Sequence, residues 1–262
     1  MSAKYFLDVG CGFIPGRSIV NIFGNVFNVM GTQVPCTLWP PAIPYIFPVA
    51  GETWRIRSTS PNDSASGSGA RAVVLQTLDP TYTQTSQVVA LDGTNPVTLP
   101  GGANYFRLNS MLVIDSGSSH INEGDIILES IGGGLTRGFI GAGIGNSLAF
   151  VYTVPAGHNL WIPNFFTNSA KSGGGQTTWR SASQLGFPNG TSIVGGTQAW
   201  ETGAIPIVVP SGFTIPEKVD FDFRVIEVGS NGININFQVT GILTDLTHPS
   251  VIQRLPTAWT EY

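Results

Sequence analysis

The chain has 262 residues, of which only 11% are charged while 33 are Gly and 18 are Pro, and its formal net charge is −4. A globular protein normally carries about 25% charged residues, so this composition favours a subunit that packs against other proteins over an ordinary soluble enzyme. No cluster of Lys or Arg provides the positive surface that nucleic-acid binding needs, and no apolar run reaches the about 20 residues of a membrane helix. We therefore expect neither a nucleic-acid partner nor a membrane span.

Residues 1–50 form a segment of their own, rich in Gly, Asn, Pro and large apolar side chains, with few charges and no clean period. So many apolar groups disfavour disorder. We expect an extended N-terminal arm whose apolar side chains are covered by a neighbouring subunit; the alternative is a pair of strands that belongs to the first β-sandwich. The arm residues expected at a subunit interface are Phe13, Phe23, Phe27, Trp39 and Phe47.

A first antiparallel β-sandwich domain is predicted over residues 51–131. Residues 53–58 (TWRIRS) place Trp54 and Ile56 on one face of a strand, as a half-buried strand requires. A loop of turn-forming residues follows, and further strands are expected at 70–78, 87–92, 105–114 and 125–129. Residues 132–146 are rich in Gly and are expected to form a linker, since no phosphate-binding register fits them.

A second β-sandwich domain is predicted over residues 147–245. Its clearest signals are two alternating segments, 219–225 and 233–240, which flank Ser230-Asn231-Gly232 and predict a β-hairpin with one buried face. The tail, 246–262, contains Trp259, which is expected either at a partner contact or in a packing strap. The fold class is therefore all-β: two tandem antiparallel β-sandwich or jelly-roll-like domains with an extended N-terminal arm.

The residue types that carry catalysis or bind metals form no recognised motif, and we expect no catalytic, cofactor-binding or metal site. His120, His158 and His248 lie in separate loop-like contexts without the spacing of metal ligands, and no GxSxG elbow is present. Cys11 and Cys36 lack CxxC spacing, so free thiols are favoured over a zinc or redox site.

Two groups of acidic residues are candidate sites. Asp220 and Asp222 share a strand face and resemble a glycosidase pair, but Arg224 on the same face favours a solvated structural surface. Asp115, Asn122, Glu123 and Asp125 offer oxygen ligands for Ca²⁺. Because they lack a known loop spacing, an ordinary polar turn is the favoured interpretation.

Several short phrases resemble a β module that recurs in virion proteins of tailed bacteriophages, including marine and cyanobacterial ones. The phrases lie within residues 51–245 and are 53–57 (TWRIR), 67–71 (GSGAR), 78–79 (LD), 88–94 (VVALDGT), 105–109 (YFRLN), 152–157 (YTVPAG) and 217–220 (EKVD). The resemblance implies a noncatalytic, β-rich structural part of a capsid, decoration or tail. It does not cover residues 1–50.

Composition and resemblance together predict a noncatalytic virion structural protein, specifically a capsid decoration or head-associated subunit. It would assemble through apolar interfaces and the arm into a homo-oligomer such as a trimer, and would contact other virion proteins such as a major capsid protein. No signal peptide is expected, so the protein would be made in the host cytoplasm and reside in the virion. The alternative is a tail, collar or fibre component with a glycan-binding surface built from Trp161, Trp179, Trp200 and Tyr82.

Overall fold

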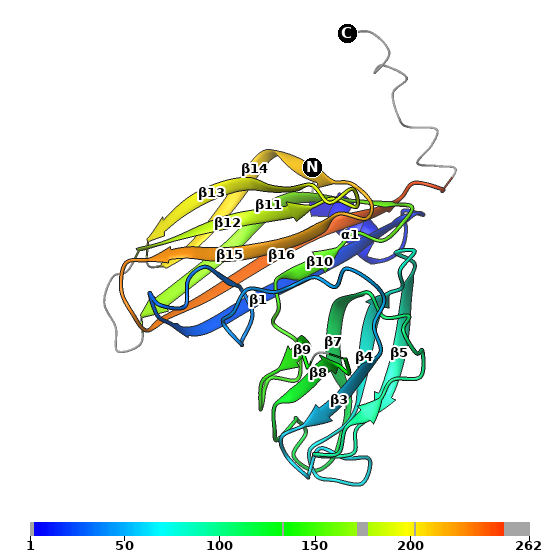
Figure 1. The fold of residues 1–262 in the computed structure, drawn as a ribbon. Helices are drawn as coiled ribbons and strands as arrows, with labels where there is room; N and C mark the ends of the chain where they lie inside the picture. The colour runs from blue at the N-terminus through cyan, green and yellow to red at the C-terminus, as the bar shows by residue number, and fades with distance from the viewer. Residues whose placement is uncertain (1–2, 133, 172–177, 202, 249–262) are drawn as a thin grey trace.

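The computed structural model describes residues 3–132, 134–171, 178–201 and 203–248. Apart from one short helix, α1 (Ala3–Gly10), the regular structure of these residues is β-strand, as Figure 1 shows. The expectation of an all-β protein is confirmed. Within the described residues, no helix combines the length and the apolar character needed to cross a membrane.

The larger of two structural units consists of two facing sheets, which lie in the upper part of Figure 1. Side chains from both sheets meet in one hydrophobic core, with Phe150, Phe221 and Phe237 among its largest buried members. The first sheet has the strand order β1 (Arg17–Val29), β16 (Ile233–Asp245), β11 (His158–Lys171), β14 (Gly203–Ile215). The second has the order β10 (Val151–Thr153), β15 (Asp220–Val228), β12 (Thr178–Gly186), β13 (Ser192–Glu201), and β2 (Cys36–Thr37) also pairs with β15.

Strand β1 belongs to this larger unit, so the prediction that residues 1–50 form an extended arm is wrong for this segment. It pairs antiparallel with β16 from Arg17↔Thr244 to Val29↔Ile233, and its inward side chains, such as Val26, are buried in the common core. The alternation of apolar and polar residues along β1 is hard to recognise in the sequence because Gly24 occupies an inward position. A Cβ atom at Gly24 would lie 2.5 Å from the Cβ of Phe150, so only glycine fits there without rearrangement.

The predicted hairpin between 219–225 and 233–240 is wrong, although both segments are strands. Strand β15 lies in the second sheet and β16 in the first, so the turn at Asn231-Gly232 crosses from one sheet to the other. Their apolar faces are buried as expected, for example at Phe223 and Ile235. Alternation identifies the buried face of a strand but does not identify its hydrogen-bonded partner.

The smaller unit also has two sheets around one core, and it lies below the larger unit in Figure 1. One sheet has the order β6 (Val97–Thr98), β3 (Trp54–Ser58), β8 (Ile126–Ser130), β9 (Thr136–Ile140), and the other β5 (Gln84–Ala90), β4 (Ala70–Leu78), β7 (Arg107–Ser116). Strand β9 falls inside the expected glycine-rich linker. Because the chain leaves the larger unit after β2 and returns to it at β10, the smaller unit is an insertion, not the first of two tandem domains.

A buried ion pair joins the two units. Arg107 on β7 donates from Nε and Nη2 to the two carboxylate oxygens of Asp220 on β15, at 2.7 and 2.9 Å. Its Nη1 donates to the backbone carbonyl of Pro48 at 2.6 Å, and its guanidinium lies 3.7 Å from the ring centroid of Phe106. Thr153 on β10 donates to the same carboxylate at 2.7 Å. Each of these polar groups has a hydrogen-bond partner. This junction between the two units therefore positions the smaller unit against β10 and β15.

Candidate functional site

The acidic pair on β15 is built into the interior and does not form a free pair of carboxylates. Asp220 is held by Arg107, as described above. Asp222 is almost fully buried, and it accepts hydrogen bonds from Arg224 at 2.8 Å and from Thr37 at 3.2 Å. Burial raises the pKa of Asp222, and Arg224 opposes that rise. The prediction that this strand face is solvated is therefore wrong. The predicted contact of Arg224 with an acidic neighbour is present, since Arg224 pairs with Asp222.

The second acidic group, around Glu123, connects loops of the smaller unit through hydrogen bonds. Glu123 accepts hydrogen bonds from Ser119, Ser68 and Asn62, which lower the pKa of its carboxyl to about 2. Asn122 is buried and bonds the backbone of Gly124, Gly141 and Gly145. These contacts favour the polar turn over the calcium site. Among the described residues, no three His, Cys, Asp or Glu side chains gather as a metal centre would require.

The residues predicted at a subunit interface lie in different environments. Phe13 is exposed just after α1, and Phe23 and Phe27 project from β1. Trp39 is buried in its own chain, and Phe47 packs in the same cluster around Tyr45, with ring centroids 5.1 and 5.0 Å from that tyrosine. Trp39 is thus a core residue, because the segment that carries it folds over β10 and β15. Trp259 lies outside the described residues.

An uncharged patch lies on the outer side of the first sheet. The strand register aligns Phe23, Gln238 and Phe166 in one row, on β1, β16 and β11 respectively. The next row, two residues along each strand, contains Asn25, Asn236 and Asn168. These six residues, which we call the amide–aromatic face, line a hollow of about 200 Å³ together with Leu148. This face could not be predicted from the sequence, since its six members come from three strands that are distant in the sequence.

Asn25 is the unusual member of the amide–aromatic face. It is only 9% exposed, and its Oδ1 atom has no hydrogen-bond partner. A buried acceptor without a partner costs about 1–3 kcal/mol, and such groups in a folded protein call for an explanation. Because Asn25 lines the hollow, a donor group on a bound molecule would satisfy it there.

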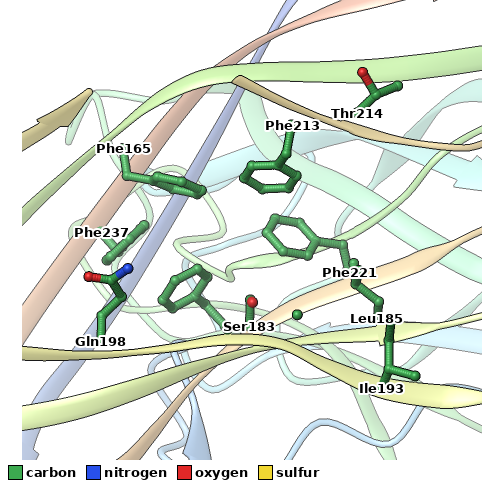
Figure 2. Close-up of a pocket in the computed structure, with 12 residues that line it drawn as sticks. Phe165, Ser183, Leu185, Ile193, Gln198, Phe213, Thr214, Phe221 and Phe237 are labelled. Carbon is green, nitrogen blue, oxygen red and sulfur yellow. The ribbon is translucent and has the colours of Figure 1, made fainter. Parts of the chain in front are cut away.

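A larger cavity of about 420 Å³ lies between the two sheets of the larger unit. Figure 2 shows the rings of Phe165, Phe213, Phe221 and Phe237 around this space, with Gln198 at one side. The rings touch one another in series: the centroids of Phe165 and Phe213 are 5.3 Å apart, and those of Phe213 and Phe221 are 6.1 Å apart. A strongly apolar cavity of this size is typical of a small-molecule site.

The four aromatic residues expected at a glycan-binding surface lie on different elements. Trp161 is half-buried, with its ring 6.4 Å from that of Phe6. Tyr82 packs on Phe106, at 5.4 Å between centroids, in the junction between the units. Trp179 and Trp200 occupy opposite positions on the paired strands β12 and β13. Of the four, only Trp179 and Trp200 lie at neighbouring positions in one sheet.

Comparisons with known proteins identify no family. No protein-family model and no curated protein sequence matches the chain. Among solved structures, the PBSX exported protein XepA aligns over 86% of both chains with 8% identity and a TM-score of 0.20. The VP2 subviral particle of infectious bursal disease virus aligns over 94% of this chain and 79% of that chain, with 10% identity and a TM-score of 0.23. At TM-scores this low, neither alignment carries an argument about this protein.

Proposed function

We propose that the protein is a noncatalytic structural subunit of a virion, attached to a capsid as a decoration or head-associated protein. The strand order of the larger unit carries this proposal. Numbered along the chain, its eight main strands are β1 and β10 to β16, and the two sheets read 1-8-3-6 and 2-7-4-5. This is the order of a jelly roll, an architecture used by viral capsid proteins and lectins. Only one jelly roll is proposed; the inserted unit has a different topology.

The outer face of the sheet β5-β4-β7 supports an assembly role. Val88, Val74 and Leu112 form one row across its three strands, since Val74 is in register with both neighbours. Val88 is 61% exposed, Leu112 is 43% exposed, and Ile114 lies exposed two residues further along β7. Contiguous exposed apolar side chains mark interaction surfaces. We assign this apolar row to contact with a second copy or with a major capsid protein, and a closed oligomer such as a trimer is the expected assembly.

Two experiments test this assignment. Light scattering of the purified full-length chain measures self-association, and a pull-down against dissociated particle components measures capsid binding. Val88→Lys and Leu112→Lys should each reduce self-association or capsid binding at least about tenfold, because a buried lysine must be desolvated. Gln84→Lys is the matched control, since Gln84 lies on the same strand and the same face but outside the apolar row. The proposal would be refuted if the wild-type chain stayed monomeric and did not bind the capsid components.

A second candidate function is a glycan-binding module of a tail, collar or fibre. The observation that favours it is the amide–aromatic face with the unpartnered Oδ1 of Asn25. Phe166 offers an exposed ring on which the C–H face of a sugar would stack, and the amides offer both donors and acceptors. The described rows carry no Asp, Glu, Lys or Arg, so this face suits a neutral saccharide.

Saturation-transfer NMR with neutral oligosaccharides distinguishes the two candidates. If the face binds glycans, Phe166→Ala and Asn168→Ala should abolish the transfer signal, whereas Leu112→Lys should leave it unchanged. Self-association that depends on Phe166 would instead make the face a subunit interface. A transfer signal that neither substitution reduces would exclude this face as the glycan site.

A further inference from the structure

The cavity between the two sheets results from small residues on its outer strands. Cross-strand register aligns Gly196 on β13 with Ser183 on β12 and with Phe223 on β15. Because Phe223 is buried in the core, this row faces inward, and two of its three positions lack a large side chain. A Cβ atom at Gly196 would find only the Ser183 Oγ atom within 4 Å, at 3.9 Å.

The walls around this space are largely aromatic, and their rings pack on one another. Phe223 stacks on Phe237 with a centroid distance of 4.2 Å, and Phe165 contacts both rings at 5.9 and 5.6 Å. Phe165 and Phe237 belong to the first sheet, so their rings form the wall of the cavity opposite Gly196. Water in such a space would find few partners, whereas apolar cavities of this kind bind apolar molecules.

The cavity is accessible from the side of β13. Ile193 and Val194 are consecutive residues whose side chains point to opposite faces of that strand, yet both are exposed. Strand β13 pairs only with β12 among the described strands. Because Ile193 lines the cavity and is itself 45% exposed, the space opens to solvent at this edge of the sheet.

The lining specifies the chemistry of the occupant. Among the described residues that line the cavity, none is Asp, Glu, Lys, Arg or His, so a charged ligand would lack a counter-charge from them. The Ser183 hydroxyl and the Gln198 amide supply hydrogen-bonding groups beside the phenylalanine rings. We infer that the inter-sheet cavity is a binding site for an uncharged, largely apolar molecule that carries a single hydrogen-bonding group.

N-phenyl-1-naphthylamine fits this description, because it is a neutral aromatic molecule with one N–H group and its fluorescence increases in apolar surroundings. Titration into the full-length protein should give saturable fluorescence, and the probe should raise the melting temperature, as any ligand of the native state does. Gly196→Leu fills the cavity, so it should weaken probe binding at least about tenfold. It should also remove the probe-induced rise in melting temperature.

Val194→Leu is the matched control, since it enlarges a side chain on the outward face of the same strand and should leave binding unchanged. Ser183→Val provides a second test if Gly196→Leu does not fold, and it should weaken binding several-fold through lost space and a lost hydroxyl. Folding of each variant is checked by circular dichroism. The inference is overturned if the folded wild type does not bind the probe, or if a folded Gly196→Leu or Ser183→Val variant binds it as tightly as the wild type.

Discussion

Replacing Arg107 with alanine should destabilise the protein through the junction between its two units. The Arg107 side chain is 6% exposed and that of Asp220 is 13% exposed, so the substitution leaves a buried carboxylate without its cation. It also leaves the carbonyl of Pro48 without its donor and removes the guanidinium from the ring of Phe106. Breaking a buried pair by removing one partner costs about 3–5 kcal/mol.

The control is Arg180→Ala. Arg180 pairs with Glu227 at 3.2 Å, but the two side chains are 53% and 62% exposed, and an exposed pair contributes about 0–1 kcal/mol. Urea unfolding followed by tryptophan fluorescence compares the variants. With a urea dependence of about 3 kcal/mol/M, Arg107→Ala should lower the unfolding midpoint by about 1–2 M, whereas Arg180→Ala should lower it by less than about 0.4 M.

The double variant Arg107→Leu/Asp220→Leu separates the loss of the pair from the burial of an unpaired charge. It should recover much of the lost stability, because apolar replacements of both partners remove the unpaired carboxylate. If Arg107→Ala shifted the urea midpoint no more than Arg180→Ala, the junction would not depend on this ion pair and the reasoning would fail.

Three further predictions follow from burial. Trp39→Ala should cost about 3–5 kcal/mol of stability and Phe27→Ala less than about 1 kcal/mol, because only Trp39 is buried; thermal melts check this, and equal losses would contradict it. The pKa of Asp222 is raised from its ordinary 3.8, so the folded protein retains a proton that the unfolded chain releases. Wild-type stability should therefore fall relative to Asp222→Asn as pH rises above about 4, and urea unfolding at pH 4 and 7 tests the sign. A thiol reagent should modify exposed Cys11 but not buried Cys36, whose pKa is raised to about 11, until the protein is denatured; reaction of both thiols in the native protein would refute this.

The sequence alone determined the all-β class and the buried faces of many strands. Trp54 and Ile56 on β3 are buried as their alternation predicted, and so are Phe221 and Phe237 on β15 and β16. Alternation with a period of two is a local property, because successive side chains of a strand point to opposite faces. It therefore appears in the sequence whatever the topology.

Only the tertiary structure decided which strands pair and which side chains meet. Strand β1 pairs with β16 at the opposite end of the chain, and this pairing turned an expected arm into part of the core. It also placed Asn25 beside Asn236, and β11 added Asn168 to the same row. The hydrogen bonds between strands involve the backbone that all residues share, so the side-chain pattern does not specify the partner strand. The candidate sites depend on those pairings, and for that reason they could not be predicted from the sequence.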